Sequence, residues 1–176
     1  MMEAYLKSVQ HQLAYYKKIG EQAMAQLSDA ELFWQYNTES NSIAIIVKHL
    51  SGNMISRWTD FFTSDGEKEN RHRDIEFIPD FSSRAEVLAC WDQGWNCFLG
   101  VINALKEEDL SKEVTIRQEK HTVIAAINRQ LAHYPYHIGQ IVFIGKMLRA
   151  TDWQSLSIPK GKSADYNAKT ITKNQS

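Results

Sequence analysis

The chain has 176 residues, of which 43% are hydrophobic and 23% are charged, and its formal net charge is −1. These proportions are typical of one globular domain with its own core. The balanced charge argues against a general nucleic-acid binder, and no apolar run reaches the roughly 18–20 residues of a membrane span. Because the first residues include Glu3 and Lys7 and lack an apolar stretch, we expect no signal peptide.

Four long segments have the spacing of apolar residues that is typical of amphipathic helices. They cover about residues 1–27, 40–62, 82–102 and 122–148. Ser40 or Asn41 is the expected cap of the second helix, and the sequence SSRAE at 82–86 resembles a capping box at the start of the third. The pattern predicts an all-α four-helix bundle in a single domain, residues 1–176.

Three segments lie outside these helices. A long polar loop, about residues 64–80, separates the second and third helices. Residues 112–122, KEVTIRQEKHT, alternate enough to predict a short extended piece. After residue 152 the sequence predicts a loop-like tail whose last ten or so residues are frayed.

The two cysteines, Cys90 and Cys97, are seven residues apart on the third predicted helix. That spacing separates them by about 10 Å, whereas a disulfide tolerates Cα atoms up to about 7 Å apart. We therefore expect reduced thiols, as in a cytoplasmic protein, that pack as apolar side chains.

The segment LAHYPYHIGQ, residues 131–140, places His133 and His137 one helical turn apart on one face, with Pro135 between them. A proline inside a helix costs about 3 kcal/mol unless a kink absorbs it. The apolar period continues on both sides of Pro135, so we predict one continuous helix. A kink beside paired histidines is either a sign of function or tolerated drift, and the sequence favours neither.

Two histidines need a third ligand to form a metal site, and His49 is the best candidate. It lies near the apolar stripe of the second helix, and Gly52, which is unfavourable inside a helix, would allow a neighbour to approach closely. For His49 alone, a buried core histidine is the better interpretation; for the three histidines together, a metal site is. His11, His72 and His121 lie in polar stretches or at a helix start, where we expect solvated or capping roles.

Residues 41–77, 121–148 and 156–163, the last reading LSIPKGKS, together resemble the DUF1572 branch of the DinB/YfiT-like superfamily of metalloenzymes. The resemblance implies a four-helix bundle that holds a metal through one histidine of the second helix and an H-x3-H pair of a later helix. Those positions correspond to His49, His133 and His137. It also implies a homodimer, and characterised relatives include transferases and isomerases that use low-molecular-weight thiols such as bacillithiol or mycothiol.

Three imidazole ligands leave coordination positions open, as in catalytic rather than structural zinc sites, and they also suit nickel and iron. No glutamate follows the first histidine of the pair, which argues against a zincin-like hydrolase. The candidate substrate-binding residues are Arg57, Arg71, Arg73 and Lys160. Charged loops are most often solvated surface, but these side chains could instead cover the metal and bind an anionic substrate.

The leading hypothesis is a cytoplasmic enzyme that depends on zinc, nickel or iron and acts on a small molecule. A more specific version of this hypothesis is a transferase that uses a low-molecular-weight thiol such as bacillithiol. One alternative is a non-catalytic metal-binding or stress-related interaction protein. The other is a metal-free bundle whose histidines are simply buried. We expect no nucleic-acid or membrane partner.

Overall fold

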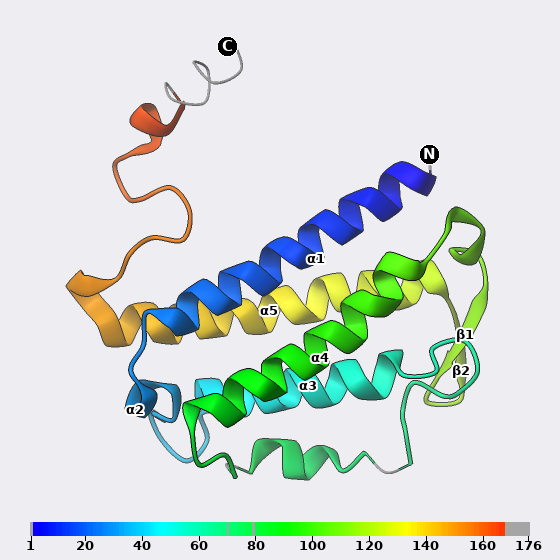
Figure 1. Ribbon diagram of the computed structural model, residues 1–176, viewed down its shortest axis with the longest axis horizontal. Helices are drawn as coiled ribbons and strands as arrows, with labels where there is room; N and C mark the ends of the chain where they lie inside the picture. Colours follow the sequence, from blue (N-terminus) through cyan, green and yellow to red (C-terminus); the bar gives the residue numbers. More distant parts are fainter. Residues whose placement is uncertain (1, 70, 79, 168–176) are drawn as a thin grey trace.

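Four long helices lie side by side and form most of the fold (Figure 1). The computed structural model describes residues 2–69, 71–78 and 80–167. The long helices are α1 (Met2–Ala25), α3 (Ile43–Trp58), α4 (Arg84–Ala104) and α5 (Val123–Arg149). Helix α3 packs against α4 and α5, and α1 packs against the same two helices. The expectation of a mostly helical fold is confirmed.

In the described part of the chain, six short elements connect or extend the long helices, and residues 163–167 of the tail are also helical. The six elements are α2 (Asp29–Leu32), the 3-10 helices η1 (Arg73–Phe77), η2 (Glu107–Asp109) and η3 (Ala150–Asp152), and the strands β1 (Glu113–Ile116) and β2 (Glu119–Thr122). The sequence pattern did not indicate α2 or η1. The last ten or so residues were expected to be frayed. Apart from residue 167, these positions lie outside the described residues.

The helix starts follow from their capping residues. Ser42 caps α3, since its hydroxyl accepts a hydrogen bond from the Ile45 amide, so the predicted start at Ser40 or Asn41 was too early. Ser83 caps α4, as the SSRAE sequence predicts. Helix α3 also ends earlier than predicted, at Trp58, because Thr59 has an extended backbone with ψ of 132°, and Asp60 follows in a left-handed conformation with φ of 49°.

The predicted extended piece is an antiparallel hairpin, so the fold is not purely α-helical. Its strands pair Glu113 with Thr122 and Ile116 with Glu119. The two turn residues, Arg117 and Gln118, have φ of 55° and 65°, a conformation that usually favours Asn or Gly. The Asp65 carboxylate accepts hydrogen bonds from both turn amides, at 2.8 and 2.7 Å, and thereby ties the 64–80 loop to the hairpin.

Large aromatic side chains fill the space between the four long helices. Trp58, Trp91, Trp95, Phe98 and Tyr134 are each no more than 2% exposed. Helices α3 and α4 approach closely at Gly94, where a Cβ atom would lie only 2.6 Å from the Cα of Ser51. Since rigid packing of this kind fixes the position of each helix, it also fixes the side chains that α3 and α5 direct toward each other.

None of the described helices is long and apolar enough to cross a membrane.

Candidate metal centre

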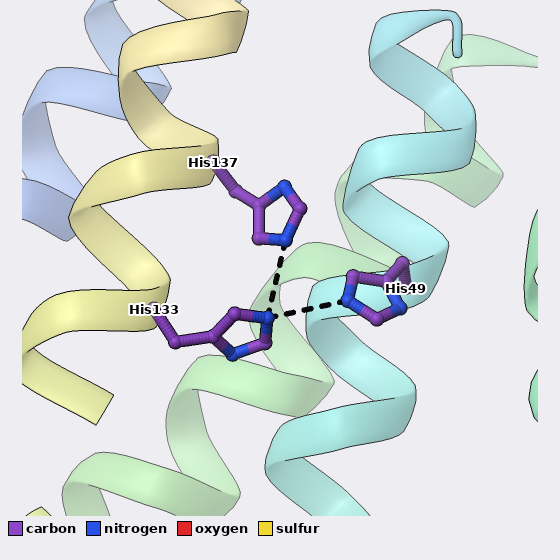
Figure 2. Close-up of side chains that lie close together, drawn as sticks. All are labelled: His49, His133 and His137. Atoms are coloured by element: carbon purple, nitrogen blue, oxygen red, sulfur yellow. Dashed lines mark hydrogen bonds between the residues drawn. The ribbon is translucent and has the colours of Figure 1, made fainter. Parts of the chain in front are cut away.

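Three histidine rings meet between α3 and α5. Figure 2 shows the rings of His133 and His137 pointing from α5 toward His49 on α3. The Nε2 atom of His133 lies 3.4 Å from Nε2 of His49 and 3.1 Å from Nε2 of His137. All three ligand atoms lie within 4.8 Å of one another. The structure therefore brings together the three histidines that the sequence singled out.

The pair on α5 faces the same way because the helix is continuous. Helix α5 runs from Val123 to Arg149 with Pro135 inside it, which confirms the prediction for this segment. The buried Tyr134 and Ile138 flank the histidines in sequence and anchor the inner face of the helix. The missing amide of Pro135 is thus tolerated in the turn that carries both ligand positions.

Hydrogen bonds at the far side of two rings select one tautomer of each neutral ring. Nδ1 of His49 lies 2.9 Å from a carboxylate oxygen of Glu76, and Nδ1 of His137 lies 2.7 Å from the side-chain oxygen of Gln140. Because both partners are acceptors, each Nδ1 carries the proton and donates it. The Nε2 atoms of His49 and His137 then keep their lone pairs, and both point at Nε2 of His133. A neutral His133 can donate to only one of them, so the cluster is short of protons and suited to a cation.

Two of the three separations between the nitrogens, those that involve His133, fit a single ion. Two nitrogens bound at about 2.0–2.1 Å to one zinc ion lie about 3.3 Å apart when the angle between them is tetrahedral. The observed separations of 3.4 and 3.1 Å bracket that value. Three imidazoles bound to one ion leave at least one position for water or another ligand.

The pKa values of His133 and His137 favour neutral rings, which are the form that binds metals. Burial, followed by the neighbouring His137 and His49, lowers the pKa of His133 to about 3. Burial and His49 also lower the pKa of His137, although its bond to Gln140 opposes the shift. Protons therefore compete weakly for His133 and His137 at neutral pH.

Glu76 is the central polar residue behind His49, and its place in a charged loop did not predict this role. It is only 7% exposed, and Arg71 donates two hydrogen bonds to it, at 2.7 and 3.0 Å. Burial acts to raise the pKa of Glu76, but the bonds from His49 and Arg71 outweigh it and lower that pKa. The carboxylate is therefore ionised at neutral pH and orients the His49 ring, as acidic partners of metal-binding histidines do.

The close approach of Glu76 depends on Gly52. A Cβ atom at position 52 would lie 2.5 Å from a carboxylate oxygen of Glu76, so only glycine leaves room for it beside α3. The expectation that Gly52 admits a neighbour is confirmed. Phe77, the next residue of η1, stacks on the His49 ring with ring centres 5.0 Å apart. The 64–80 loop thus covers His49 instead of extending into solvent.

A family model described as a protein of unknown function, DUF1572, matches residues 1–162. The chain belongs to the DUF1572 family. No curated protein and no solved structure matches this DUF1572 chain.

The four candidate substrate-binding residues of this DUF1572 protein lie in three different places. Arg57 and Arg73 line a cavity beside His49 and His133. Arg71 is buried against Glu76 and Glu67 and supports the histidine cluster from behind. Lys160 is exposed in the tail, which leaves the helices at the end of α5, and it does not line the cavity (Figure 1).

Four other residues near the cluster were not predicted, and helical spacing indicates only two of them. Gln140 follows His137 by three residues, so it could have been found as a neighbour on the same helix face. Arg129 precedes His133 by four residues and could have been found in the same way. Glu76 and Arg117 come from loops and turns, where no periodic signal indicates direction.

A second, larger hollow of about 660 Å³ is lined in part by Gln140. Exposed aromatic side chains line it, among them Tyr36 at 74%, Tyr136 at 62% and Phe143 at 69%.

His11, His72 and His121 lie outside the histidine cluster. Within the described part of the chain, His49, His133 and His137 form the one group whose geometry could hold a metal ion.

Proposed function

We propose that the protein is an enzyme that uses a divalent metal ion held by His49, His133 and His137. The observation that carries the proposal is the convergence of three Nε2 atoms, two of which keep a lone pair because Glu76 and Gln140 accept the proton on Nδ1. Buried histidines with a structural role usually satisfy each other or the backbone. Lone pairs that face one another are instead the arrangement that a cation stabilises.

The residues around the cluster have distinct roles in this proposal. Glu76 holds the His49 proton at Nδ1 and so orients Nε2 toward the ion. Arg71 neutralises the Glu76 charge, so that the carboxylate remains buried without a free negative charge. A divalent ion with an open position lowers the pKa of a water or thiol that binds to it.

The proposed reaction is transfer to or from a low-molecular-weight thiol. Support comes from the resemblance to the DinB/YfiT-like superfamily, which contains thiol-dependent transferases, and from the open position of a three-histidine site. In this proposal α1, α3, α4 and α5 form a four-helix bundle of the DinB type. Zinc, nickel and iron are the metals that the ligand set suits.

Metal binding is tested by titrating the metal-free protein with zinc and comparing single alanine variants at the three ligand positions. We expect one ion per chain for the wild type and loss of most binding in each variant, with the helical circular dichroism retained. His11→Ala, an exposed histidine on α1, is the matched control and should bind like the wild type. Equal binding by His133→Ala would contradict the proposed ligand set.

Catalysis is tested by mixing the zinc-loaded protein with low-molecular-weight thiols and an aryl halide that changes absorbance on substitution. The thiol sulfur would form a bond to the aryl carbon while halide leaves, and the thiol proton would pass to solvent. We expect turnover that His133→Ala and a chelator both abolish. A fully loaded protein that turns over none of the thiols would contradict the transferase proposal and leave a metal-binding protein.

We also propose that two copies associate in the cytoplasm, as is common in the superfamily that the sequence resembles. The exposed Tyr36, Tyr136 and Phe143 form an apolar surface that such an association would remove from water. Light scattering should give twice the mass of the chain, and a monomer at micromolar concentration would contradict this proposal.

A further inference from the structure

A small cavity of about 170 Å³ opens directly beside the histidine cluster. Its wall comes from α3, η1, the hairpin turn and α5, and no acidic side chain lines it. The lining residues are His49, Asn53, Arg57, Arg73, Arg117, Arg129, Gln130 and His133. Four arginines around so small a space are unusual, because like charges repel unless an anion lies between them.

Arg57 is the buried arginine of the four, at 4% exposed. One terminal nitrogen, Nη2, binds Glu67 at 2.9 Å, but Nε and Nη1 are buried and have no hydrogen-bond partner among the described residues. Burial lowers the pKa of Arg57, Glu67 opposes the shift, and the positive charges of Arg71, Arg117 and Arg129 add to it. A buried donor without a partner is costly, so these groups indicate a missing acceptor.

The carboxylates nearby do not balance the arginines. Glu67 is shared by Arg57, Arg71 and Arg117, with the second and third contacts at 3.6 and 3.2 Å. Arg129, on the exposed side of α5, makes no ion pair with any described residue. The cavity wall therefore carries an excess of positive charge.

An oriented amide adds a further donor. Tyr134, which is fully buried, donates a hydrogen bond to the side-chain oxygen of Asn53 at 3.1 Å, and Trp58 donates to the Tyr134 hydroxyl at 3.2 Å. This chain of bonds fixes the Asn53 amide with its oxygen toward Tyr134. Its NH2 group is then free to donate to a ligand in the cavity that Asn53 lines.

We propose that this cavity binds the oxyanion group, a carboxylate or a phosphate, of a small anionic substrate. Arginine suits both groups because its parallel N–H donors match their oxygens. The volume is below the roughly 300 Å³ at which pockets for drug-sized ligands begin, so it holds a charged group with a few carbons and not a nucleotide. That the reacting atom lies at the three histidines rests on the proposed function; the binding of the anion rests on the arginines.

The test measures anion binding to the full-length, metal-free protein by calorimetric titration with inorganic phosphate and, separately, with succinate. We expect at least one of them to bind one per chain, and the tighter of the two identifies the oxyanion. Arg129→Gln should weaken that binding about tenfold or more, because a hydrogen bond to a charged group is lost. Arg149→Gln, at the far end of the same helix, is the matched control and should change the affinity less than twofold.

The same preparations are then titrated with zinc, so that the two proposals can fail separately. Normal zinc binding with no binding of either anion would overturn the inference and leave the metal proposal intact. Anion binding without zinc binding would overturn the metal proposal and leave this inference intact. An Arg129→Gln variant that binds the anion as tightly as the wild type would also overturn the inference. Arg57→Lys, which keeps the charge but loses the paired donors, should weaken binding as well.

Discussion

Replacing Gly52 by alanine should weaken metal binding without unfolding the protein. The new Cβ atom would lie 2.5 Å from the nearest Glu76 oxygen, whereas ordinary contact begins at 3.4 Å, so the carboxylate must retreat by about 0.9 Å. If the carboxylate moves directly away from His49, the distance from Nδ1 of His49 to the Glu76 oxygen increases from 2.9 Å to about 3.8 Å, which is beyond hydrogen-bond range. The His49 ring then loses the acceptor that fixes its orientation.

The expected magnitude follows from what such partners contribute. Loss of an acceptor behind a metal-binding histidine typically reduces metal affinity 10- to 100-fold, which is about 1.4–2.7 kcal/mol. Alanine is also better than glycine inside a helix by about 0.8–1.0 kcal/mol, which offsets part of the strain. We therefore expect a melting temperature of the metal-free protein close to that of the wild type.

The assay is competition for zinc between the protein and a coloured chelator, with melting followed by circular dichroism. Gly100→Ala is the matched control because position 100 lies within α4, is exposed and has open space around a new Cβ. It should raise stability through helix propensity alone and leave zinc affinity unchanged. A Gly52→Ala protein that is folded and binds zinc as tightly as the wild type would refute the role assigned to Glu76.

Three further predictions concern other parts of the chain. Replacing Cys90 and Cys97 together by serine should leave the zinc stoichiometry unchanged, because both thiols lie on α4 outside the histidine cluster; loss of zinc would show that a ligand has been overlooked. Lys160→Ala should change the melting temperature by less than about 1 °C, since the residue is exposed and makes no ion pair with a described residue; a drop of several degrees would mean that the tail packs. Duplex DNA should bind weaker than micromolar at physiological salt because net charge is −1, and a salt-sensitive submicromolar affinity would disprove this.

The helical spacing of apolar residues predicted the features that lie within single helices. The apolar spacing around Pro135 indicated a continuous helix, and the same spacing placed His133 and His137 on one face. Gly52 was recognisable because glycine is unfavourable within a helix and must have a local reason. These signals lie within single helices, where the geometry of the backbone translates sequence distance directly into direction.

The remainder of the site depends on contacts between distant segments. Glu76 reaches His49 only because η1 folds back onto α3, and the polar sequence of the 64–80 loop resembles ordinary solvated surface. Arg117 reaches the cavity from a hairpin turn that Asp65 stabilises from another loop. No local pattern encodes such pairings. Lys160 was proposed from its charged segment, and the structure places it in the exposed tail.

The most direct test of a metal held by the three histidines is an anomalous diffraction map, measured at the zinc edge, from crystals grown with zinc. We predict one strong peak between α3 and α5, about 2.0–2.2 Å from the Nε2 atoms of His49, His133 and His137. A protein that contains zinc but shows its peak elsewhere, with the space among these three rings empty, would contradict the account.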